Sequence, residues 1–182
     1  LNPSSAASDV YKRQAKAKLI LDWLEWGLSV GLVEKANTTS YASRLILAPK
    51  YKGNTPKTAP PDGIRIAWAG VNVNDNLEKT VPTYPDAWEQ LYKVANKRYK
   101  FSADGLKQYW SIPLAENSRD ITAFWTPRGL FRFTRLVMGT KNAATISQNA
   151  YTHAMYAKLP ERSLENVANF ADDFLGGEDT PE

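Results

Sequence analysis

The segment Val167-Ala168-Asn169-Phe170-Ala171-Asp172-Asp173-Phe174-Leu175 decides the fold of this chain. Apolar residues run into the adjacent acids Asp172 and Asp173 and continue after them. This pattern predicts a strand, a tight turn that carries both acids, and a returning strand. Two carboxylates at a turn between buried strands repel each other, and a bound divalent cation such as magnesium commonly offsets that repulsion.

A third acid ends a second short strand upstream. The segment Tyr99 to Asp104 is aromatic and apolar, ends in Asp104, and is followed by Gly105 to Leu114. An adjacent pair of acids is frequent in solvated loops, so this third acid is what makes a site credible. Acids on a strand end and on a neighbouring hairpin can bracket two metal ions, as in-line phosphoryl transfer requires. We therefore expect the carboxylates of Asp104 and Asp172 to converge.

Four segments, in order, resemble the reverse transcriptases. Phe101 to Leu114 resembles their first catalytic motif, and Phe170 to Asp173 resembles their Tyr-x-Asp-Asp box with Phe in place of Tyr. Between them, Ile121 to Phe133 and Leu136 to Ala143 resemble the same enzymes in long-terminal-repeat retrotransposons, in particular the Ty3/gypsy-like group. The resemblance covers roughly Leu19 to Gly176. It implies an α+β fold with an antiparallel palm sheet backed by helices, plus a fingers subdomain.

The resemblance also implies an activity, which is RNA-directed DNA polymerisation. Asp104 and Asp172 would coordinate two magnesium ions, with manganese as a substitute, and Asp173 would support the site. The implied partners are an RNA or DNA template with its primer strand, and the deoxynucleoside triphosphates.

A predicted hairpin in the N-terminal half corresponds to the fingers of these enzymes. Its strands are Ser43 to Pro49 and Ile64 to Ala69, and the loop between them is rich in Pro, Gly and Lys, as expected of a mobile fingertip. By resemblance, Arg65 grips the triphosphate of the incoming nucleotide, and Lys50 or Lys52 supplies a point charge. For each lysine taken singly, a solvated basic loop is an equal alternative.

Further residues for the nucleotide follow from the resemblance. Tyr109 would lie beneath the sugar and exclude a 2′-hydroxyl by a steric clash, although a half-buried structural tyrosine is the alternative. Lys107 and Gln108 would offer backbone N–H groups to the triphosphate. The loop with Met138 and Gly139 would touch template and nucleotide.

Helical periodicity predicts three helices. The first starts near Ala15 and ends at Gly27 or Gly31. The second is capped by Asp86, and its apolar stripe is expected in the core. The third helix, Lys141 to Lys158, should pack closely against a sheet through a face of small residues. The apolar stripe of the second helix comprises Trp88, Leu91, Tyr92 and Ala95, and the small-residue face of the third helix comprises Ala143, Ile146, Ala150, Ala154 and Ala157.

Composition narrows the chemistry. The chain has 182 residues, 43% of them apolar, which allows one core or two lobes. It has no cysteine and only one histidine, His153, which excludes thiolate metal sites and disfavours histidine zinc sites and a Ser-His-Asp triad. The net charge of +4 is compatible with a nucleic-acid partner. No run of about 18 or more apolar residues occurs, so we expect no membrane span and no membrane partner. No charged-then-apolar leader suggests secretion, and we expect an intracellular, cytoplasmic location, with a virus-like particle or the nucleus as alternatives.

The expected domain organisation has three parts. Residues 1–14 have the composition of a non-native leader, residues 15–98 form the fingers with the first palm-connecting helix, and residues 99–182 form a palm truncated after the hairpin. We expect the thumb, RNase H and integrase domains of the polyprotein to be missing.

Two alternatives stay open. Within the same class, the chain could be an RNA-dependent RNA polymerase or a reverse transcriptase of an element without long terminal repeats, although the segment Thr126 to Phe131 and Tyr109 disfavour both. In a different class, it could be an inactive relic or a nucleic-acid-binding module whose acids are only structural.

Overall fold

The chain folds into two compact units, each with its own sheet. The computed structural model describes residues 3–37, 39, 41–51, 53, 63–81 and 84–180, with side chains from residue 14 onward. Unit 1 comprises Leu1–Leu77 and Pro113–Thr140, and unit 2 comprises Glu78–Ile112 and Lys141–Glu182. The boundaries expected from the sequence lay elsewhere, because residues 78–98 group here with the C-terminal half and residues 113–140 with the N-terminal half.

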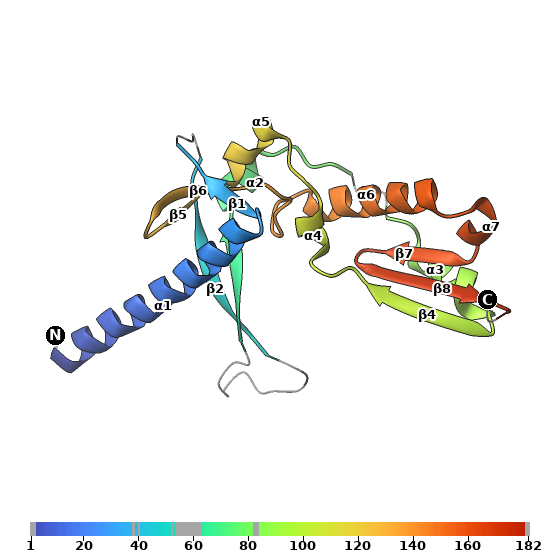
Figure 1. Ribbon diagram of the computed structural model, residues 1–182, viewed down its shortest axis with the longest axis horizontal. Helices are drawn as coiled ribbons and strands as arrows, with labels where there is room; N and C mark the ends of the chain where they lie inside the picture. Colours follow the sequence, from blue (N-terminus) through green and yellow to red (C-terminus); the bar gives the residue numbers. More distant parts are fainter. Residues whose placement is uncertain are drawn as a thin grey trace. The chain divides into compact units, whose positions relative to one another are not determined.

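Unit 1 holds a five-stranded sheet in the order β1-β6-β5-β2-β3 (Figure 1). The predicted hairpin of β2 and β3 is confirmed by their antiparallel register. A second antiparallel hairpin, β5–β6, turns at Pro127 and Arg128, and a parallel pairing of β2 with β5 joins the two hairpins. The strands are β1 Val33–Lys35, β2 Ser43–Lys50, β3 Gly63–Ala69, β5 Phe124–Thr126 and β6 Gly129–Phe133.

Helix α1 (Pro3–Ser29) contributes the fully buried Leu24 to the apolar core of unit 1. It begins earlier than predicted and runs through most of the expected leader. It ends before Gly31, whose φ of +65° suits glycine. The Trp23 ring lies 6.0 Å from the Phe124 ring and 5.9 Å from the Phe133 ring, and those two rings are 4.9 Å apart. No helix among the described residues is both long enough and apolar enough to cross a membrane.

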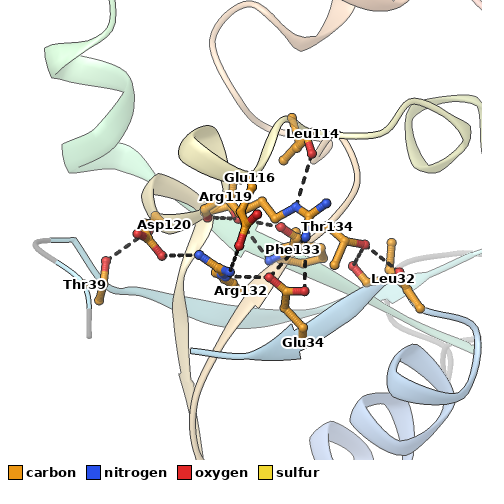
Figure 2. A network of polar contacts seen from close by, with 12 residues as sticks. Leu32, Glu34, Thr39, Leu114, Glu116, Arg119, Asp120, Arg132, Phe133 and Thr134 are labelled. Atoms are coloured by element: carbon orange, nitrogen blue, oxygen red, sulfur yellow. Dashed lines mark hydrogen bonds and ion pairs between the residues drawn. The ribbon is translucent and has the colours of Figure 1, made fainter. Parts of the chain in front are cut away.

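A network of charged side chains connects residues 116–122 of unit 1 to its sheet (Figure 2). Glu34 on β1 accepts hydrogen bonds from Arg132 Nε on β6 at 2.6 Å and from Arg119 Nη1 at 3.2 Å. Arg132 Nη1 also donates to Asp120 Oδ1 at 2.8 Å. The hydrogen bond to Asp120, and then that to Glu34, raises the pKa of Arg132 above its ordinary value. The network therefore fixes α5 (Glu116–Arg119) and the 3-10 helix η1 (Asp120–Thr122) on β1 and β6.

Unit 2 holds a three-stranded antiparallel sheet in the order β4-β8-β7 (Figure 1). On β7 the neighbouring residues Ala168 and Asn169 are both buried, and adjacent strand residues point to opposite faces, so both faces of β7 are covered. Two sheets with packed helices confirm the predicted α+β class. The elements are α3 Ala87–Ala95, β4 Tyr99–Asp104, α4 Gln108–Ser111, α6 Ala143–Lys158, α7 Glu161–Leu164, β7 Val167–Phe170 and β8 Asp173–Glu178, and α2 (Val71–Asn76) belongs to unit 1.

The expected core stripe of α3 is wrong, although its cap is confirmed. Asp86 Oδ1 accepts hydrogen bonds from Trp88 N at 2.8 Å and from Glu89 N at 3.0 Å. However, the Trp88 and Tyr92 side chains are 68% and 72% exposed. The opposite side of the helix is packed: Val94 is buried, and Gln90 Oε1 accepts a hydrogen bond from Asn169 N at 3.4 Å. A polar residue that completes a backbone hydrogen bond thus faces the sheet in place of the aromatic rings.

The expected packing face of α6 is confirmed only at its first residue, Ala143, which is buried. Ile146 is exposed, as are Ala154 and Ala157 further along the helix. Thr145 and Gln148 are buried instead, and Gln148 hydrogen-bonds to Asn169 on β7. His153 lies on the exposed side, as predicted.

Candidate active site

Three acids from two distant parts of the sequence meet at one end of the unit 2 sheet. Asp104 is the last residue of β4, and its partner across the antiparallel ladder is Asp173, the first residue of β8. Asp173 also pairs with Phe170 on β7, so the turn consists of Ala171 and Asp172. The prediction that the turn carries both acids is therefore wrong for Asp173, which both neighbouring strands hold within the ladder. All three acids are exposed.

Gly105 allows the end of β4 to approach the turn. Its N–H donates to the backbone oxygen of Asp172 at 2.8 Å. A Cβ atom at residue 105 would lie 3.3 Å from that oxygen and 3.2 Å from Gln108 Cβ, which is tighter than nearly all such contacts. A glycine after Asp104 therefore lets the two acid-bearing segments make direct backbone contact.

The turn has a strained backbone that side chains support. Ala171 has a φ of +55°, a conformation that costs about 1–2 kcal/mol for a residue other than glycine. Its N–H donates to Gln148 Oε1 at 2.7 Å, and its carbonyl oxygen accepts from Gln108 Nε2 at 3.0 Å. These glutamine side chains are only 2% and 3% exposed, respectively.

Behind the turn lies a second set of hydrogen bonds. Gln148 Nε2 donates to Asn169 Oδ1 at 2.6 Å and to Thr152 Oγ1 at 3.1 Å, and Thr152 Oγ1 donates to Asn169 Oδ1 at 3.2 Å. Neither Gln148 nor Asn169 was predicted as a site residue from the sequence. The available signal was a buried-strand pattern, Val167 to Phe170, interrupted by an asparagine that needs partners once buried.

Tyr109 lies close to the acids. Partial burial of its ring raises the pKa of the Tyr109 phenol above its ordinary value of 10.0, and the charges of Tyr84 and Asp172 raise it further. The Tyr84 ring packs 5.9 Å from the ring of Phe170, which immediately precedes the turn. The phenol of Tyr109 therefore stays protonated and neutral beside Asp172 at ordinary pH.

The two residues before Tyr109 have specific local roles. Lys107 has a φ of +51°, and its Nζ lies 5.5 Å from the centre of the Trp110 ring. The Gln108 N–H donates to the Gly105 oxygen at 3.1 Å, so its side chain and its backbone both serve the fold here. A backbone contact from Lys107 and Gln108 to a triphosphate stays a prediction.

The other residues predicted to bind the nucleotide lie in unit 1. Arg65 pairs with Ala48 and Lys50 pairs with Gly63, so the register puts Arg65 and Lys50 on the same face of the β2–β3 hairpin, both exposed. Lys52, with most of the loop expected to be a mobile fingertip, lies outside the described residues.

The loop predicted to touch template and nucleotide is also in unit 1. Met138 is exposed, and Gly139 has a φ of +104° that favours glycine. Asn74 Nδ2 donates to the Gly139 oxygen at 2.8 Å, which fixes this loop to α2.

The acids fit a metal site that the substrate completes. Within the part of the chain that the structure describes, no three His, Cys, Asp or Glu side chains form a cluster that could hold a metal ion by itself. Mg²⁺ in nucleotide-handling sites is usually held by one or two carboxylates, with substrate phosphates and water supplying the other oxygens. Exposed carboxylates of Asp104, Asp172 and Asp173 at one sheet end are a donor set of this kind.

The fold is that of reverse transcriptases. A foamy viral protease-reverse transcriptase solved with an RNA/DNA hybrid matches with a TM-score of 0.73 and 18% identity, over 92% of this chain and 20% of that one. The same kind of enzyme solved with double-stranded DNA matches with a TM-score of 0.70 and 21% identity, over 91% of this chain and 32% of that one. A prototype foamy virus protease-reverse transcriptase gives a TM-score of 0.71 and 21% identity, over 92% and 20% of the two chains.

A sequence relative agrees with this fold. The chain is 28% identical, over 136 residues, to a retrovirus-related Pol polyprotein from transposon 412 of Drosophila melanogaster. The match covers 72% of this chain and 10% of the polyprotein, so the chain spans about a tenth of that relative. No family profile matches the chain. The resemblance to retrotransposon reverse transcriptases drawn from the motifs is thereby confirmed.

Proposed function

We propose that this chain is the catalytic part of an RNA-directed DNA polymerase, which adds deoxynucleotides to the 3′-hydroxyl of a primer. The observation that carries the proposal is the backbone placement of Asp104, Asp172 and Asp173, which lie next to one another at one end of the unit 2 sheet. The similarity in fold to reverse transcriptases and in sequence to a retrotransposon polyprotein supports it.

Each acid has a proposed role. Asp104 and Asp172 hold two magnesium ions, or manganese as a substitute, and Asp173 supports the site. When bound, the ions lower the pKa of the primer hydroxyl and neutralise the leaving pyrophosphate. Arg65 grips the triphosphate through its planar guanidinium, and Lys50 adds a point charge.

The proposed partners are nucleic acids and nucleotides. The foamy viral relatives were solved with double-stranded DNA and with an RNA/DNA hybrid. By extension, this chain binds an RNA or DNA template with its primer and accepts deoxynucleoside triphosphates. The thumb, RNase H and integrase domains of a polyprotein are its proposed companions.

A primer-extension assay on the complete protein tests the function. We expect labelled deoxynucleotides to be added to a DNA primer on an RNA template in the presence of Mg²⁺. Addition should stop when EDTA removes the ion and return when Mg²⁺ or Mn²⁺ is restored, because the carboxylates alone cannot neutralise the leaving pyrophosphate. Tight duplex binding without addition in either ion would instead favour the nucleic-acid-binding relic.

Tyr109→Val tests the proposed selection of the sugar. Removing the ring should raise ribonucleotide incorporation, relative to deoxynucleotide incorporation, by about tenfold or more, because the clash with the 2′-hydroxyl is lost. The measurement is the ratio of kcat/KM for the two nucleotides in primer extension. Tyr109→Phe is the matched control, since it keeps the ring and should leave the ratio unchanged. An unchanged ratio in Tyr109→Val would make Tyr109 a structural residue.

A further inference from the structure

Two buried glutamines hold the peptide groups on either side of Ala171. The Ala171 N–H can only donate and its carbonyl can only accept, so Gln148 must present its oxygen and Gln108 its amide nitrogen, as their hydrogen bonds of 2.7 and 3.0 Å show. Gln148 thereby fixes the peptide plane between Phe170 and Ala171. Gln108 fixes the plane between Ala171 and Asp172.

Fixing both planes fixes the direction of Asp172. Peptide groups are planar, so the orientation of two successive planes sets φ and ψ of the residue between them. That residue, Ala171, has an unfavourable φ of +55°, which persists only where its surroundings enforce it. The two glutamines therefore fix the position of the Asp172 Cα atom, from which the carboxylate extends.

Each glutamine is itself held from behind. Gln148, on α6, donates to Asn169 Oδ1 at 2.6 Å and to Thr152 Oγ1 at 3.1 Å. Gln108 begins α4, and the hydroxyl of Ser111 donates to its carbonyl oxygen at 2.6 Å and lies 2.8 Å from the hydroxyl of Tyr151 on α6. The first two bonds restrict the side chain of Gln148, and the Ser111 bond fixes the backbone from which the Gln108 side chain extends.

Simple filling of the core does not account for this arrangement. Burying an amide is costly unless its hydrogen bonds are made, and an apolar side chain of similar size would be cheaper to bury. Here both glutamines are nearly fully buried, and each forms a hydrogen bond from its side-chain amide group to the backbone of the same turn residue, Ala171.

We propose that Gln108 and Gln148, which we name the glutamine clamp, are positioning residues that orient the Asp172 carboxylate for metal binding. The inference rests on the proposed polymerase function. Loss of supporting hydrogen bonds behind metal ligands typically lowers metal affinity or activity by about 10–100-fold.

The test compares Gln148→Met and Thr152→Val in the complete protein. Gln148→Met keeps the size and removes the acceptor for the Ala171 N–H, so kcat should fall about 10–100-fold and half-saturation should need several-fold more Mg²⁺, while the KM for primer–template is unchanged. Thr152→Val removes a hydrogen bond to the same side chain without touching the turn, and should stay within about twofold of the unaltered protein.

Amide hydrogen exchange of the segment spanning residues 169–173 gives a readout independent of activity. We expect faster exchange in Gln148→Met than in Thr152→Val, because only the first frees the Ala171 N–H. Should Gln148→Met fail to fold, Gln108→Met removes the bond on the other side of Ala171 and carries the same expected loss in kcat and Mg²⁺ affinity.

The outcomes separate the inference from the function. An unaltered protein that adds no nucleotide overturns the polymerase proposal, and the clamp falls with it even if exchange shows that the glutamines hold the turn. In an active protein, an unchanged Mg²⁺ requirement in Gln148→Met overturns the clamp and leaves the polymerase standing. Equal losses in Thr152→Val and Gln148→Met would also overturn it, since they would reflect general destabilisation.

Discussion

Asp172→Asn should reduce nucleotide addition by the complete protein about a thousandfold, which is the largest effect we expect on activity. Asparagine has nearly the same shape as aspartate and lacks its negative charge, so the change removes metal binding with little change in volume. Asp172 lies exposed at the turn, and its backbone oxygen, which accepts from the Gly105 N–H, is unaffected by the substitution. The measurement is single-nucleotide primer extension at saturating Mg²⁺.

Asp179→Asn is the matched control in the same unit. Asp179 is exposed and pairs with Lys97 Nζ at 3.1 Å, next to the end of β8 opposite the turn. Its loss should leave activity within about twofold, because exposed ion pairs contribute little. If Asp172→Asn keeps substantial activity while its circular dichroism is unchanged, Asp172 does not bind the catalytic metal.

Phe124→Ala should have the largest effect on stability. Phe124 is fully buried in unit 1, and its ring lies within 6.0 Å of the rings of Trp23 and Phe133. Removing an enclosed aromatic ring leaves a cavity and costs about 3–5 kcal/mol of unfolding free energy. For a chain of this size, each kcal/mol lowers Tm by about 2–4 °C, so thermal unfolding followed by circular dichroism should show a shift of about 10 °C.

The neighbouring Trp125→Ala separates burial from the mere loss of an aromatic ring. Trp125 follows Phe124 on β5 and is 60% exposed, because successive strand residues point to opposite faces. Its substitution should change the unfolding free energy by about 0.5 kcal/mol or less. Equal losses in the two variants would contradict the placement of Phe124 in the core.

Features that depend on neighbouring residues could be predicted from the sequence. Three such features are the β2–β3 hairpin, the Asp86 cap and the strand ending in Asp104. They follow from the alternation of apolar and polar residues, from helix capping and from the turn residues that end a strand, each of which acts within a few residues. The order of the motifs also predicted the reverse-transcriptase fold, because that order is itself a property of the sequence.

The candidate site could be predicted only in part. The sequence singled out Asp104, Asp172 and Asp173, yet it put Asp173 in the turn and missed Gln148. The register in which β7 pairs with β8 decides which residues form the turn, and this register depends on which side chains the sheet buries.

The sequence by itself determined the local elements, the acids and the family resemblance. Only the tertiary structure decided which faces of α3 and α6 pack, and which side chains hold the turn. The physical reason is that burying a polar group is costly unless it finds a hydrogen-bond partner. Gln90, Gln148 and Asn169 therefore lie where each finds hydrogen-bond partners inside the fold, whereas hydrophobic periodicity predicted that aromatic or small residues of α3 and α6 would be packed there. Their partners lie far away along the chain, so the sequence pattern does not reveal them.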